Sequence, residues 1–83
     1  MDDIKQAIKS YILHEFLPGE DPANLTDSLH LVRSGILDSL ARLNLVAFLE
    51  ERFNVKIEAH EASTANLDTI NSIAALIERK KAG

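Results

Sequence analysis

SLARLNLVAFLEERFN, residues 39–54, decides the fold, because it is the longest amphipathic run in the chain and contains neither Gly nor Pro. Its apolar spacing predicts a helix from Ser39 to about Phe53, with Asn54 ending it in the left-handed conformation. The expected core stripe is Leu45, Val46, Leu49 and Phe53, with Leu43 beside it. Ser39 therefore lies at a helix N-terminus, where free backbone N–H groups and the positive dipole end favour an anion such as a phosphodiester.

Helical periodicity recurs on both sides of this run. Residues 3–17 place Ile4, Ile8, Ile12 and their neighbours at helical spacing, and Pro18-Gly19 ends that segment. A last helix is predicted over 69–81, with Asp68 as its cap, and a short helix over about 60–65. Since no segment reads as a strand, the sequence predicts an all-α four-helix bundle with three long helices and one short helix.

A long connection, about residues 18–38, separates the first two long helices. A loop of this length is uncommon in a small domain and tends to be functional. We expect one short helical turn within it, around residues 28–33. Its expected buried anchors are aliphatic: Leu25, Leu29, Leu31, Val32, Ile36 and Leu37.

Composition restricts the possible functions. With 83 residues, the chain is expected to form a single domain over 1–83, too small to enclose a large catalytic cleft. The net charge of −4 argues against nucleic-acid binding, and no apolar stretch is long enough to span a membrane. The absence of Cys excludes disulfides and thiolate chemistry from the chain itself, and the acidic start is unlike a leader peptide. We therefore expect a cytoplasmic protein, and we also expect it to be a monomer.

The triplet Asp-Ser-Leu occurs twice, at 27–29 and at 38–40. Gly35 interrupts any helix that begins at Ser28, whereas Ser39 opens a full-length helix. Ser39 is therefore predicted to be the functional serine, and Ser28 is predicted to be a decoy that only caps a turn. His14, His30 and His60 are expected to be ordinary surface residues, with neither a catalytic triad nor a metal site. A plain protein-interaction module in which Ser39 is only a helix cap remains the alternative.

With these features on one chain, the sequence resembles the acyl, peptidyl and aminoacyl carrier proteins. The resemblance spans nearly the whole chain: helix, long loop, Asp38-Ser39-Leu40, second helix, an extended 55–57 segment, a short helix and a last helix. It implies a non-enzymatic carrier that holds cargo as a thioester on 4′-phosphopantetheine attached to Ser39. Asp38 would lie beside the coenzyme A of the modifying enzyme, and Leu40 would contact the arm. The implied partners are a phosphopantetheinyl transferase, a cargo-loading ligase or acyltransferase, and a downstream synthase or transferase of fatty-acid, polyketide or nonribosomal-peptide biosynthesis.

Two departures from the housekeeping fatty-acid carriers indicate a specialised, stand-alone carrier of the D-alanyl or nonribosomal-peptide type. Gly35 stands four residues before Ser39, where those carriers usually place it three before, and the early acidic residues of the second helix are missing. Partner docking is instead predicted at an outward face of the second helix, with late acidic character: Ala41, Asn44, Phe48, Glu50 and Glu51. An acyl cargo would shelter between the second and third helices, beside Leu43, Val46, Ile57, Ala62 and Leu67. Arg42 either extends its guanidinium into water or contacts the arm's phosphate or a cargo carboxylate.

Overall fold

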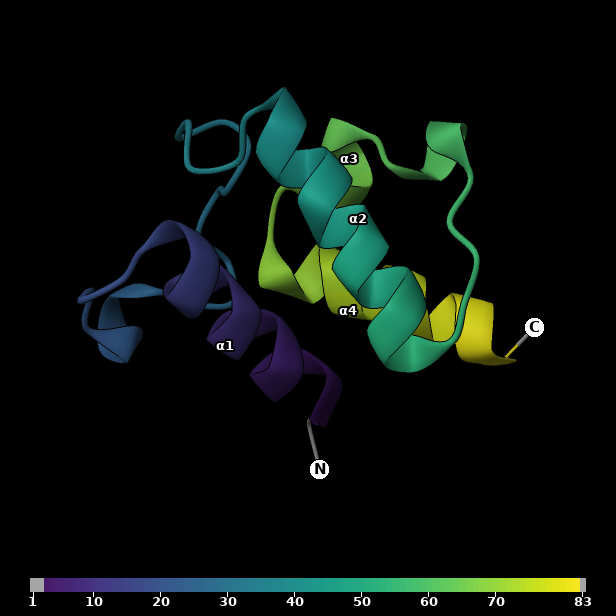
Figure 1. Ribbon diagram of the computed structural model, residues 1–83, viewed down its shortest axis with the longest axis horizontal. Helices are drawn as coiled ribbons and strands as arrows, with labels where there is room; N and C mark the ends of the chain where they lie inside the picture. The colour runs from purple at the N-terminus through teal and green to yellow at the C-terminus, as the bar shows by residue number, and fades with distance from the viewer. Residues whose placement is uncertain (1–2, 83) are drawn as a thin grey trace.

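The computed structural model describes residues 3–82, which form helices joined by irregular segments (Figure 1). The three long helices are α1 (Asp3–Phe16), α2 (Ser39–Phe53) and α4 (Ile70–Ala82), and the short one is α3 (Thr64–Leu67). Two 3-10 turns accompany them, η1 (Pro22–Asn24) and η2 (Ala59–Glu61). The described residues contain no strand, so the predicted bundle of three long helices and one short helix is confirmed.

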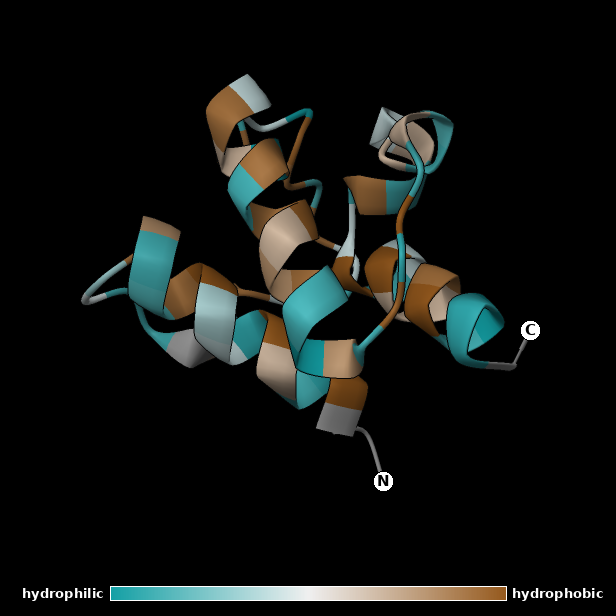
Figure 2. Ribbon diagram, turned by 45° about the vertical axis from the view of Figure 1, so that its right-hand side comes forward, coloured by the Kyte–Doolittle hydropathy of each residue, from teal (hydrophilic) through white to brown (hydrophobic). Residues whose placement is uncertain are grey.

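The helix α4 organises the core, because it packs against α1, α2 and α3. Ile70, Ile73, Ala74 and Ile77 recur at helical spacing along α4 and are all buried, and Leu76 is buried with them. In Figure 2, hydrophobic and hydrophilic residues are mixed along each long helix, as expected when one face is buried and another meets water. No helix in residues 3–82 has the length and apolar character that crossing a membrane would require.

The ends of α2 agree with the sequence prediction. The helix begins at Ser39 and ends at Phe53, and Asn54 follows with a φ of 55°, in the left-handed region. The backbone N–H of Asn54 donates to the carbonyl of Glu50, which closes the last turn. The next residues, 55–57, belong to no helix and no strand, in agreement with the absence of a predicted strand.

Three local predictions differ from the structure. The turn expected around residues 28–33 lies slightly later, where the Ser34 N–H donates to the His30 carbonyl at 3.3 Å, and it does not extend into a helix. The short helix expected at about 60–65 is divided into η2 and the later α3. The cap of α4 is Thr69, whose hydroxyl accepts a hydrogen bond from the Ser72 N–H at 3.0 Å. Asp68 does not fill this role, because its carboxylate is buried and bonded to the long loop instead.

Candidate functional site

Ser39 is exposed and is the first residue of α2. Asp38 caps the helix: its carboxylate accepts a hydrogen bond from the Ala41 N–H at 2.8 Å, and its backbone carbonyl accepts one from the Arg42 N–H at 2.9 Å. The capping fixes the direction in which α2 starts. It also leaves the Ser39 hydroxyl on the surface, where another protein has access to it.

The loop that leads to Ser39 is held by two fully buried leucines, Leu31 and Leu37. The Leu37 N–H donates to the carbonyl of Leu31 at 2.9 Å, so the chain between them closes on itself. Gly35 makes this closure possible with a φ of +89°, a conformation that other residues rarely adopt. The loop thus delivers Asp38 and Ser39 to a fixed place above the core.

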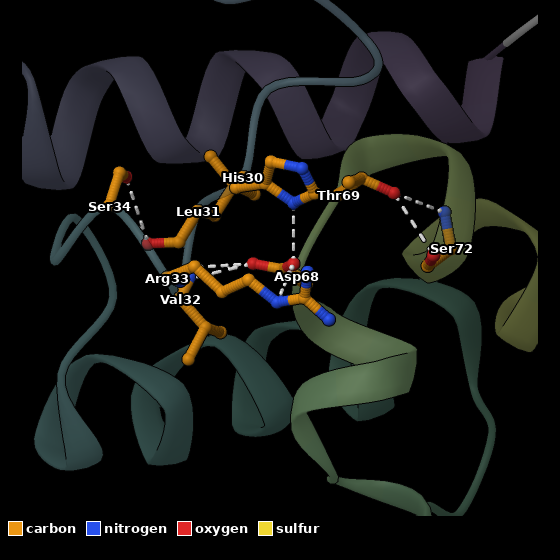
Figure 3. A network of polar contacts seen from close by, with 8 residues as sticks. All are labelled: His30, Leu31, Val32, Arg33, Ser34, Asp68, Thr69 and Ser72. Carbon is orange, nitrogen blue, oxygen red and sulfur yellow. Dashed lines mark hydrogen bonds and ion pairs between the residues drawn. The ribbon is translucent and has the colours of Figure 1, made fainter.

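Asp68, which follows α3 in the sequence, binds residues 30–33 of the same loop (Figure 3). One carboxylate oxygen accepts the backbone N–H groups of Val32 at 3.0 Å and Arg33 at 3.1 Å, and the other meets the His30 ring at 2.7 Å. The Arg33 guanidinium lies 3.2 Å from this second oxygen. Burial opposes ionisation of Asp68, but these donors outweigh it and hold the pKa of the carboxyl below its ordinary value.

Sequence reasoning missed this network, since His30 was expected to be an ordinary surface histidine and Asp68 a helix cap. The two residues are 38 positions apart, and no local pattern links them. The other predicted loop anchors are correctly placed: Leu25 is buried, and Leu29, Val32 and Ile36 are half-buried against the core. Ser28, which was predicted to be a decoy, is exposed in a turn, and the neighbouring Asp27 pairs with Lys9 of α1 at 2.9 Å.

A groove of about 350 Å³ opens beside Ser39. Its lining residues come from α2 and from the η2 segment: Ser39, Arg42, Leu43, Val46, Ala59 and Ala62. The η2 wall is fixed by a capping box between Glu58 and Glu61, and by an ion pair of 2.7 Å between Glu61 and Lys80 of α4. That lysine is the main cause of the lowered pKa of Glu61.

Only some of the residues predicted to line a cargo pocket line this groove. Leu43, Val46 and Ala62 line it as expected. Ile57 and Leu67 do not, because both are buried in the packed core, and Ala59 takes their place on the η2 wall. The difference arises because η2 and α3 are separate elements, so that Leu67 turns into the core.

The predicted docking face is also partly corrected. Asn44 and Glu51 are exposed, but Ala41 is only 7% exposed and belongs to the core. Phe48 is half-buried and stacks on Tyr11 of α1, with 4.1 Å between ring centroids and 11° between ring planes. Glu50 has an internal partner, since its carboxylate accepts the Ile57 N–H at 2.8 Å. Ala41 and Phe48 therefore do not face outward as expected, because α2 buries the face centred on Ala41, Leu45 and Leu49.

Two large apolar side chains on α2 take the exposed positions instead. Leu40 is 67% exposed and Leu43 is 68% exposed. Leu43 was expected beside the buried stripe, but it lies on the opposite side of the helix from Leu45. Together with Asn44 and Glu51, these leucines form the solvent-facing side of α2, next to Ser39.

Comparison with known proteins now identifies the family. The family described as phosphopantetheine attachment site matches residues 12–77 of the chain. The chain belongs to the phosphopantetheine-binding carrier proteins. This carrier protein is 34% identical over 79 residues to a probable acyl carrier protein, PigG, of a Serratia species, covering 95% of this chain and 90% of that one. It is 33% identical over 76 residues to a D-alanyl carrier protein of Lactobacillus helveticus, covering 92% of each, and 32% identical over 71 residues to one of Streptococcus suis, covering 86% of each.

These similarities confirm the predicted resemblance to stand-alone carriers. The protein is a carrier rather than an enzyme, and it holds its cargo as a thioester on covalently bound 4′-phosphopantetheine. When attached, that group supplies the thiol, which suits a chain without Cys. The surroundings of Ser39 fit the group, since an exposed hydroxyl at a capped helix start adjoins an open groove with mostly apolar walls. As a carrier, the protein depends on partner enzymes that modify it, load it and unload it.

Proposed function

We propose that Ser39 is the attachment residue and that the groove beside it receives the arm or its cargo. The observation that carries the proposal is the exposed Ser39 hydroxyl on the first turn of α2, beside the groove. Asp38 and Leu40 flank it, with Asp38 toward the coenzyme A of the modifying enzyme. Leu43, Val46 and Ala62, together with Ala59, supply the apolar walls for an acyl cargo. An aminoacyl cargo requires little of this space.

Ser28 offers a matched control, because it is also exposed and also stands between Asp and Leu. The protein is incubated with coenzyme A and a broad-specificity phosphopantetheinyl transferase, and its intact mass is then measured. Wild type and Ser28→Ala are expected to gain one phosphopantetheine, whereas Ser39→Ala is expected to gain none while keeping its helical circular dichroism. A mass gain that survives in Ser39→Ala, or none in wild type, would show that the attachment residue is wrong.

The exposed side of α2 is proposed as the partner-docking surface. It comprises Leu40, Leu43, Asn44 and Glu51, an apolar pair with only one acidic residue. Neighbouring large apolar side chains that are exposed to solvent are typical of a surface that a partner covers. In the same assay, Leu40→Ser and Leu43→Ser are expected to slow modification by the transferase without lowering thermal stability. Equal rates in both variants and in wild type would remove this surface from transferase docking.

The similarity to D-alanyl carriers and to a probable acyl carrier protein supports an aminoacyl or acyl cargo, loaded by a ligase or acyltransferase and passed to a downstream synthase or transferase. We propose that the protein works as a cytoplasmic monomer. The alternative, a helical interaction module in which Ser39 is only a cap, is disfavoured because the helix already has its cap in Asp38.

A further inference from the structure

Arg42 is the one charged residue among those that line the groove. Its side chain is half-buried, and its Nε is shielded from solvent. Within residues 3–82, no described group accepts a hydrogen bond from this Nε. None of the ion pairs found among these residues includes the Arg42 guanidinium. A buried donor without an acceptor is unfavourable, so the groove is chemically incomplete at this point.

Arg42 and Ser39 are three residues apart on α2, and both line the same groove. Side chains at this spacing are neighbours on one face of a helix. A phosphodiester on the Ser39 hydroxyl therefore forms beside Arg42. Guanidinium groups bind phosphate oxygens through strong charge-assisted hydrogen bonds.

We propose that the Arg42 guanidinium turns toward the phosphodiester of the arm, binds it through its Nε and so directs the arm along the groove. The inference rests on the proposed attachment at Ser39. Arg42 is a positioning residue in this role. In this role, the Nε–H of Arg42 gains a hydrogen-bond acceptor when the arm is attached to Ser39.

The charges around Ser39 leave Arg42 as the counter-charge for the phosphodiester. The Asp38 carboxylate already occupies the Ala41 N–H at the start of α2, so this helix donor is not free for the phosphate. The same carboxylate adds a negative charge next to the attachment point. The remaining lining residues, Leu43, Val46, Ala59 and Ala62, carry no charge, so Arg42 is the counter-charge that the groove provides.

The direct test follows the Arg42 Nε–H group by nuclear magnetic resonance. Proton–nitrogen spectra of arginine side chains are recorded for the apo protein and for the modified protein with a free thiol, and Arg42→Lys assigns the signal. We expect the Arg42 signal to shift, and its exchange with water to slow, when the arm is attached. Arg52 serves as an internal control, because it is exposed at the other end of α2 and is expected to keep its signal unchanged.

A second readout is the change in melting temperature on attaching the arm. We expect the change, holo minus apo, to be lower in Arg42→Gln than in wild type, and Arg52→Gln to match wild type. An Arg42 signal that stays unchanged in the free-thiol holo protein would overturn the inference alone, and one that moves only after cargo loading would assign Arg42 to the cargo instead. Failure of Ser39 to gain the arm would overturn the attachment proposal as well, and the intact mass distinguishes that outcome.

Discussion

Asp38 contributes both a helix cap and a negative charge beside Ser39. Its carboxylate caps α2 by accepting the Ala41 N–H at 2.8 Å, and it also places a negative charge directly before Ser39. An amide oxygen serves as an N-cap about as well as a carboxylate, so the charge and the cap are separable by substitution.

We expect Asp38→Ala to lower the free energy of unfolding by about 1 kcal/mol, the usual effect of losing an N-cap, and Asp38→Asn to lower it much less. Both variants are expected to be modified more slowly at Ser39, because both lack the charge proposed to lie beside coenzyme A. Urea unfolding measures the first effect, and the rate of mass gain measures the second. Normal modification of Asp38→Asn would assign the residue to capping alone.

One face of α2 packs into the core, and the opposite face is exposed to solvent. Ala41, Leu45 and Leu49 repeat every four residues and are buried, while Leu40 and Leu43 are exposed on the other side. Phe48 lies at the edge of the buried face and reaches α1 through its stack on Tyr11. The aromatic pair therefore joins α1 to α2, and α4 packs against both helices.

The stack is expected to be energetically coupled. In a double-mutant cycle of Tyr11→Ala, Phe48→Ala and the double variant, we expect an interaction energy of about 1 kcal/mol beyond the separate effects, as is usual for packed aromatic pairs. Urea unfolding of the four proteins gives this value. Additivity within about 0.3 kcal/mol would mean that Phe48 packs against α1 without a specific aromatic interaction.

Across the whole molecule, carboxylates tie together segments that are distant in sequence. Asp27 pairs with Lys9 and Lys5 of α1, Glu61 pairs with Lys80 of α4, and Asp68 holds the long loop. The pKa of each carboxyl is lowered: by the Lys9 hydrogen bond for Asp27, by the Lys80 hydrogen bond for Glu61, and for Asp68 by hydrogen bonds that outweigh its burial.

A lowered pKa in the folded state means that the unfolded chain binds protons more readily. The stabilisation by these groups is therefore complete when the pH is above their ordinary pKa values, 3.8 for Asp and 4.5 for Glu. It is lost as the pH falls through the lower pKa values of the folded state. We expect the free energy of unfolding to decrease on acidification below about pH 4.5, as measured by urea unfolding at a series of pH values. Asp68→Asn is expected to be less stable than wild type at neutral pH and to show a shallower acid dependence. An unchanged slope in that variant would exclude Asp68 from the acid response.

Local sequence determined much of this protein. Helical periodicity and helix-boundary residues located α1, α2 and α4 to within a residue or two. Residues such as Asp, Pro-Gly and Asn at the ends of an amphipathic repeat indicate where the helix begins and ends. The second Asp-Ser-Leu triplet was preferred over the first for the same reason, since one opens a long helix and the other stands before Gly35. Composition also indicated that any thiol must come from a cofactor.

Tertiary structure decided how those pieces meet. The pairing of Asp68 with a loop more than thirty residues away, the burial of Ala41, the stack of Phe48 on Tyr11 and the passage of Ile57 and Leu67 into the core all depend on packing between elements. A helical repeat identifies an apolar face, but which side of that face is covered depends on neighbours that are remote in the chain. The groove beside Ser39, with Arg42 in it, is lined by residues of α2 and of the η2 segment, and the ion pair between Glu61 of η2 and Lys80 of α4 helps to hold η2 in place.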